Sequence, residues 1–104
     1  MTISAIDTRS VTPETDPHYE ARIDLAAVFR MTARLNMHES VANHFSYAVS
    51  DDGNQFLINP FGRHFSSVRA SELLLLDARD DTTMEQPNAP DPTAWAIHSA
   101  MHRR

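Results

Sequence analysis

The chain has 104 residues, which suits one domain and is short for two. Its net charge of −5 at pH 7 comes from interspersed acidic and basic residues, whereas a nucleic-acid-binding face needs clustered basic residues. Cysteine and lysine are both absent from the sequence. Within this chain, disulfides, thiolate zinc sites and lysine Schiff bases are therefore excluded.

The sequence also lacks targeting signals. No apolar run approaches the roughly 20 residues that a membrane-spanning helix needs. The first residues have neither the positive start nor the apolar stretch of a signal peptide. We therefore expect a cytoplasmic protein without a membrane partner, in which residues 1–17 form a flexible arm and residues 18–104 form the domain.

An amphipathic helix is predicted over residues 18–36. Asp16 and Pro17 resemble an N-cap followed by a proline in the first turn, and Asn36 suits the helix end. Between them, an apolar stripe recurs at helical spacing and is widened by Phe29. The stripe consists of Ala21, Leu25, Val28, Thr32 and Leu35.

A β-hairpin is predicted next. Residues 45–50 alternate between large apolar and small side chains, which is a strand pattern. A turn follows in which Gly53 can adopt a positive φ. Residues 55–59 form the return strand, with Phe56 and Ile58 on one face.

The segment after the hairpin has only short secondary-structure patterns. Pro60 ends the return strand, and Gly62 permits a tight bend or a close approach of a ligand. Residues 67–71 resemble a turn, with a helical turn possible over 70–73. The leucine run 73–76 is interpreted as a buried strand.

The last third of the chain is predicted to be a loop followed by a helix. Residues 78–92 hold three prolines and several acids, which is typical of a loop. A helix follows over 93–104, with Thr93 as its cap. Its large side chains fall mainly on one side: Trp95, Ile97, His98, Met101 and His102.

The histidines have two interpretations. His98 and His102 are four residues apart on the predicted helix, so both rings can face one metal ion. No third ligand is evident nearby, and ordinary packed or surface histidines are the simpler interpretation. His64, beside the glycine corner, either contacts an anion or is solvated.

Two corners flank the hairpin and can hold an anion. Asn43 and Ser46 bracket the first, and Gly62 lies in the second. Backbone N–H groups and short polar side chains in such loops can cradle a phosphate or a carboxylate. Two ordinary turns are the alternative. The acidic pairs 51–52 and 80–81 are interpreted as solvated loop charge.

Taken in order, these pieces resemble the first part of the class II aldolase/adducin domain. The resemblance covers about residues 20–104, and its specificity lies in the joint occurrence of the pieces. They are the helix from Arg22 to Arg30, Asn43–Ser46, Leu57–Gly62, Ser71–Asp77, and the tail from Thr93 to His102.

The resemblance implies a fold and a ligand class. The expected fold is α/β, a partial three-layer α/β/α domain around a mainly antiparallel sheet. Enzymes of the family are zinc-dependent lyases of sugar phosphates, related members act on other small compounds, and adducins bind the spectrin–actin skeleton. The positions that match the family's ligand-binding loops are Asn43, Ser46, Phe61, Gly62 and Thr93, so the resemblance implies a small phosphorylated or carboxylated ligand there. It also implies a homo-oligomer.

Three departures from the family pattern limit the expected chemistry. The zinc histidines follow the helix that matches 93–104, so we expect no metal ligand, no cofactor and no catalytic residue within this chain. Zinc or another divalent metal is expected only in a complete member. The general-base glutamate is replaced by Ala94, the phosphate-binding serine pair falls at Pro92–Thr93, and Ala42 replaces a glycine.

These departures leave two hypotheses. In the first, the chain is the N-terminal part of a lyase-like protein, truncated before the metal site and without independent catalysis. In the second, it is a non-catalytic binding or oligomerisation module of the adducin type.

Overall fold

The computed structural model describes residues 15–37 and 43–103, so most of the expected arm lies outside the described residues. No helix in this described part is long and apolar enough to cross a membrane. The connections contain three short 3₁₀ turns: η1 (Phe65–Ser67), η2 (Ala70–Glu72) and η3 (Thr83–Glu85). The main elements are α2 (Tyr19–Arg34), β1 (Ser46–Ala48), β2 (Gln55–Ile58), β3 (Leu74–Asp77) and α3 (Pro92–His102).

The three strands form one antiparallel sheet in the order β1-β2-β3. Ser46 lies opposite Ile58 and Ala48 lies opposite Phe56, so the two predicted strands pair as a hairpin. Gly53 in its turn has φ +78°. The hairpin and its glycine turn are therefore confirmed, although β1 is shorter than the predicted strand.

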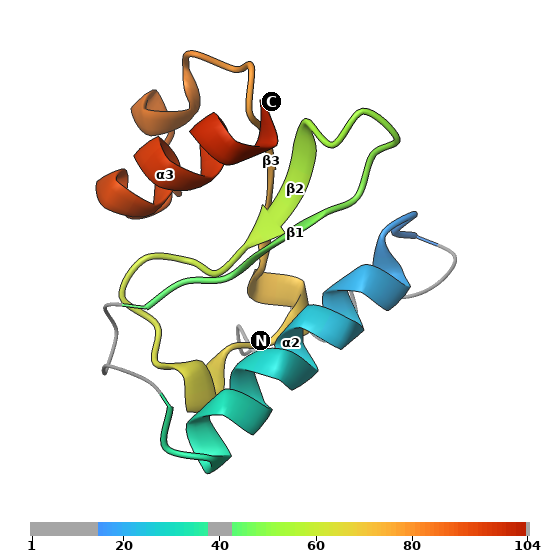
Figure 1. Cartoon of the computed structure of the whole chain (residues 1–104), viewed down its shortest axis with the longest axis vertical. Coiled ribbons are helices and arrows are strands. Elements are labelled where there is room, and N and C mark those ends of the chain that lie inside the picture. Colours follow the sequence, from blue (N-terminus) through green and yellow to red (C-terminus); the bar gives the residue numbers. More distant parts are fainter. Residues whose placement is uncertain (1–14, 38–42, 104) are drawn as a thin grey trace, which may run out of the picture.

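The two helices cover opposite faces of the sheet, as Figure 1 shows. Leu57 belongs to a core cluster with residues of α2, whereas its neighbours Phe56 and Ile58 belong to a second cluster with Ala94 of α3. Because successive side chains of a strand point to opposite faces, β2 is buried on both sides. The partial α/β/α arrangement agrees with the expected fold class.

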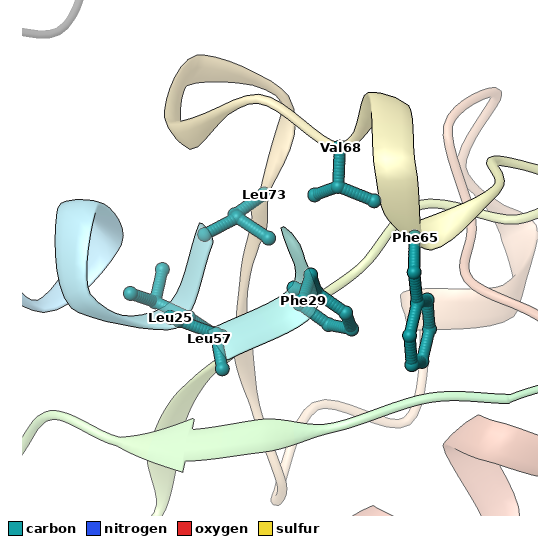
Figure 2. Close-up of a cluster of buried hydrophobic side chains, with 6 residues drawn as sticks. All are labelled: Leu25, Phe29, Leu57, Phe65, Val68 and Leu73. Atoms are coloured by element: carbon teal, nitrogen blue, oxygen red, sulfur yellow. The ribbon is translucent and has the colours of Figure 1, made fainter. Parts of the chain in front are cut away.

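The core between α2 and the sheet is built on an i, i+4 pair. Leu25 and Phe29 of α2 pack in one cluster with Leu57 (Figure 2). The rings of Phe29 and Phe65 are arranged edge to face, with their centroids 4.5 Å apart. Val28 and Leu35, predicted to face inward, are 47% and 62% exposed. The buried stripe of α2 is thus rotated away from the predicted one. It runs through Ala21, Leu25, Phe29 and Ala33.

The start of α2 also differs from the prediction. His18 is the N-cap, and Asp16 precedes it, accepting a hydrogen bond from the His18 amide at 2.8 Å. The predicted end is confirmed, because Asn36 has φ +58° and the Met37 amide donates back to the Thr32 carbonyl. Asparagine tolerates this left-handed conformation at a helix end better than most residues.

Arg22 ties α2 to the segment that leads into β3. Its Nη1 donates to the carbonyl oxygens of Ala70 at 3.1 Å and Leu73 at 2.7 Å. Its Nε lies 2.6 Å from a carboxylate oxygen of Asp16. One half-buried guanidinium therefore holds the helix start, the turn η2 and the entry to β3 together.

The leucine run forms a strand preceded by a helical turn, as predicted, but the strand is not fully buried. Leu73 is 3% exposed and closes the α2 core, whereas Leu75 within β3 is 43% exposed. β3 is an edge strand of the described sheet, so one of its sides lacks a neighbouring strand, and Leu75 is exposed although its partner Leu57 in β2 is buried.

The helix α3 starts one residue earlier than predicted, with a different cap. Asp91 is the N-cap and its carboxylate accepts a hydrogen bond from the Ala94 amide at 3.0 Å. Thr93 is therefore not the cap and lies exposed in the first turn. The buried residues are Ala94, His98 and Ser99, whereas Ile97 and Met101 are about half exposed.

Candidate functional site

A hydrogen-bonded chain of three histidines and one serine joins β1 to α3. His44 Nδ1 lies 2.6 Å from His98 Nε2, and His98 Nδ1 lies 2.5 Å from Ser46 Oγ. Ser46 Oγ also lies 2.8 Å from His102 Nε2. We call this group the His–Ser chain: His44, His98, Ser46 and His102.

The fold explains why these four side chains meet. Ser46 lies directly opposite Ile58 in the register, so both side chains project from the same face of the sheet, toward α3. His98 and His102 are one helical turn apart and share a face of α3. The His102 ring is also stacked on the Phe56 ring, with centroids 4.4 Å apart, which fixes its orientation.

Burial favours the neutral form of the two histidines of α3 in the His–Ser chain. His98 is 8% exposed, and burial, with smaller effects of His44 and His102, lowers the pKa of its imidazole to about 4. Burial likewise lowers the pKa of His102. At neutral pH each of these imidazoles offers one N–H donor and one nitrogen acceptor, which suits a continuous hydrogen-bonded chain.

The His–Ser chain does not fit a metal ion. Both ring nitrogens of His98 already have hydrogen-bond partners, and His102 Nε2 is bonded to Ser46. Within residues 15–37 and 43–103, no group of three or more His, Cys, Asp or Glu side chains is arranged to hold a metal. The metal interpretation of His98 and His102 is therefore not supported by their geometry.

A cleft of about 470 Å³ opens beside the His–Ser chain, between α2, β1 and α3. Its volume lies within the usual range for small-molecule sites. The walls are mainly apolar, and polar groups come from Asp24, Tyr47 and three of the four members of the His–Ser chain. The lining consists of Asp24, Leu25, Val28, His44, Phe45, Ser46, Tyr47, His98 and Met101.

A larger cleft of about 700 Å³ lies at the start of α2, but its charge is unsuitable for an anion. It is lined by four carboxylates, those of Asp16, Glu20, Asp24 and Asp51. Their negative charges repel a phosphate or a carboxylate. For an anionic ligand, the cleft beside the His–Ser chain is the better candidate.

The structure brings together only some of the predicted ligand-binding residues. Ser46 lies in the His–Ser chain, and the Asn43 carbonyl accepts a hydrogen bond from Asn59 Nδ2 at 3.1 Å, next to the glycine corner. In that corner Gly62 has φ +80° and Phe61 is 67% exposed. Thr93 lies five residues before His98, about 7.5 Å away along the helix axis. Ala42 lies outside the described residues.

The other predicted polar groups have local structural roles. His64 Nδ1 accepts a hydrogen bond from the Ser66 amide at 3.1 Å and so caps η1. Hydrogen bonds from Ser50 and Asn54 lower the pKa of Asp52 to about 2 and shape the hairpin turn. These groups lie in turns, as the sequence indicated for the acidic pairs.

Two residues that the sequence did not single out contribute to the site. His44 forms one end of the His–Ser chain, and the buried Asn59 side chain bridges the segment before β1 to the end of β2. Asn59 follows a predicted strand and precedes Pro60, and a polar residue there is a weak signal. The partnership of His44 with His98, 54 residues away, has no sequence signature.

Comparisons with known proteins agree with this architecture. Residues 23–104 match the family model for the class II aldolase and adducin N-terminal domain. A protein from Caulobacter vibrioides described as a putative aldolase class 2 protein is 32% identical over 87 residues, which are 84% of this chain and 34% of that protein. A protein of the same description from Pseudomonas aeruginosa is 37% identical, over 81% of this chain and 32% of that protein.

Adducins and a solved structure are also similar. Rat alpha-adducin is 28% identical, over 78% of this chain and 11% of its own length. The crystal structure of an aldolase II superfamily protein from Pseudomonas syringae matches with a TM-score of 0.65 and 34% identity, over 80% of this chain and 34% of that one. This chain thus spans about a third of the length of the aldolase-type relatives.

Proposed function

Because the chain belongs to the class II aldolase and adducin family, we propose that it supplies the ligand-facing N-terminal part of a lyase-type domain. The proposed ligand is a small phosphorylated or carboxylated compound, bound in the cleft between α2, β1 and α3. The observation that carries this proposal is the connection of Ser46, a family-matched residue, to His98 and His102 at that cleft. A cytoplasmic location is part of the proposal.

Aldol cleavage by this chain alone is not part of the proposal. Ala94 stands at the position of the family's general base and has no group that accepts a proton. Its side chain is 1% exposed and is packed in the core with Phe56 and Ile58. Zinc or another divalent metal is proposed only for a complete domain that provides the family's histidine ligands.

A second candidate function is that of an oligomerisation or binding module of the adducin type. The observation that favours it is the row of exposed apolar side chains Val28, Met31 and Leu35 on one face of α2, which are 47% to 62% exposed. Exposed apolar surface of this kind is common at protein interfaces.

Ligand binding can be tested by NMR titration of the histidine ring protons with two probes, dihydroxyacetone phosphate and pyruvate. We expect either probe at millimolar concentration to shift the ring signals of His44 and His98, which line the cleft. Signals of His18 serve as the internal control, because this residue lies at the start of α2, outside that lining. Unchanged His44 and His98 signals with both probes would refute the proposed ligand class.

A further inference from the structure

His44 joins the His–Ser chain through one ring nitrogen, which leaves the other ring nitrogen for a different partner. Its Nδ1 faces His98 Nε2, and its ring lines the cleft between α2, β1 and α3. Within the part of the chain that the structure describes, no residue forms a hydrogen bond with His44 Nε2. A ligand in the cleft is therefore the natural partner of this nitrogen.

The His–Ser chain has two complete hydrogen-bond arrangements. In one, His44 Nδ1–H donates to His98, His98 Nδ1–H donates to Ser46, and the Ser46 hydroxyl donates to His102 Nε2. In the other, every donor and acceptor is exchanged. His44 Nε2 is an acceptor in the first arrangement and carries a proton in the second, because a neutral imidazole carries one N–H.

We propose that His44 is a proton-transfer group of this cleft, and that His98, Ser46 and His102 form a proton relay behind it. In the first arrangement His44 Nε2 takes a proton from the ligand. The Nδ1 proton of His44 then moves to His98 Nε2, the Nδ1 proton of His98 to Ser46, and the hydroxyl proton of Ser46 to His102 Nε2. His102 finally releases its Nδ1 proton to solvent, and the second arrangement results.

His44 suits the role of base better than His98. Both nitrogens of His98 are bonded within the relay, and burial lowers the pKa of His98 to about 4, far below neutral pH. His98 is therefore a positioning residue that holds His44 Nδ1 and couples the tautomer of His44 to its own. This inference rests on the proposed function for the location of the ligand, but proton transfer needs neither the missing glutamate at Ala94 nor an anionic ligand.

The test uses 5-nitrobenzisoxazole, a neutral aromatic probe that opens when a base removes its single ring C–H proton next to nitrogen. The C–H electron pair completes the nitrile, the N–O bond breaks, and a cyanophenolate leaves. We expect ring opening to fall about 100-fold in His44→Gln, the lower end of what a positioned base contributes. The matched control His18→Gln replaces a histidine whose side chain makes no capping hydrogen bond, and should keep the full rate.

The pH profile distinguishes His44 from the other titratable groups that line the cleft, Asp24 on α2, Tyr47 on β1 and His98 on α3. A rate that rises with a midpoint between pH 5 and pH 8 is expected for a histidine base. A midpoint below pH 5 would point to Asp24 or His98, a midpoint near pH 10 would point to Tyr47, and any of these results would overturn the assignment. An unchanged rate in His44→Gln would overturn it as well.

The relay is tested by NMR of the His44 tautomer. His98→Leu removes the partner of His44 Nδ1, so we expect a changed ratio of the two His44 tautomers and a shifted midpoint of the rate, with His98→Gln restoring both. If His98→Leu fails to unfold cooperatively, Ser46→Ala replaces it, because it interrupts the relay one step further away. An unchanged tautomer and midpoint would refute the relay. Because the probe is neutral, these results are independent of phosphate or pyruvate binding.

Discussion

At the scale of single residues, His98 links the site to the pH dependence of folding. The pKa of its imidazole is lowered from 6.5 to about 4 in the folded chain, first by burial and then by His44 and His102. The folded state thus favours the neutral form. Above pH 6.5 this stabilisation is complete, because His98 is then neutral in both states. As the pH falls from 6.5 toward 4, only the unfolded state takes up the proton, and the stabilisation is lost.

We therefore expect the free energy of unfolding to fall between pH 6.5 and pH 4 by an amount that depends on His98. The His98 contribution is on the order of 2 kcal/mol, less than the full pKa shift implies, because solvent reaches part of the ring. Urea unfolding at a series of pH values measures it. His98→Gln should lose this part of the pH dependence and His18→Gln should keep it. Equal slopes in His98→Gln and the wild type would contradict the prediction.

At the scale of elements, Arg22 joins three segments that are distant in the sequence. Its guanidinium donates to two backbone carbonyls near β3 and lies against the carboxylate of Asp16 before α2. Hydrogen bonds from a charged donor to half-buried carbonyls stabilise more than neutral ones, and their loss leaves the carbonyls without a partner.

Replacing Arg22 by alanine should lower the free energy of unfolding by about 1.5–3 kcal/mol, the range for hydrogen bonds that involve a charged group. Denaturant unfolding at pH 7 measures this change. Arg34→Ala removes an exposed arginine from the last turn of the same helix, and a change within about 0.5 kcal/mol is expected there. Similar losses in the two variants would show that the contacts of Arg22 have no special weight.

The elements themselves were largely predictable, but their orientations were not. Alternating side chains and Gly53 specify the hairpin, because they act within about 15 neighbouring residues. The inward face of α2 depends on η1, which packs there from a distant part of the sequence, so Val28 was wrongly predicted to be buried. The pairing of His98 with His102 was predictable because it depends only on their local spacing. Their connection through Ser46 and His44 was not, because it depends on how the strands and α3 are placed in space.

At the scale of the whole molecule, the described surface retains apolar side chains on several elements. On α2 they form a row, and Tyr47, Leu75 and Met101 add exposed apolar area on β1, β3 and α3. The described chain corresponds to about a third of its aldolase-type relatives. The proposed homo-oligomer would remove part of this surface from water, at roughly 25 cal/mol per Å² of apolar area.

We expect the isolated chain to self-associate in a concentration-dependent way, measurable by sedimentation. The double variant Val28→Glu, Met31→Glu should shift the mass toward the monomer, because burying two carboxylates in an interface is costly. The control Gln86→Glu, Asn88→Asp adds the same charge to exposed positions of the loop before α3 and should leave association unchanged. A monomer at all concentrations would argue against α2 as an interface.

The central position of β2 has a consequence for how this chain can be divided. Three of its four residues are fully buried: Leu57 belongs to the α2 core, and Phe56 and Ile58 belong to the α3 core. A fragment that ends before β2 leaves α2 without a sheet, and a fragment that begins after β2 leaves α3 without one. A cut on either side of β2 therefore separates one helix from the strand that completes its core.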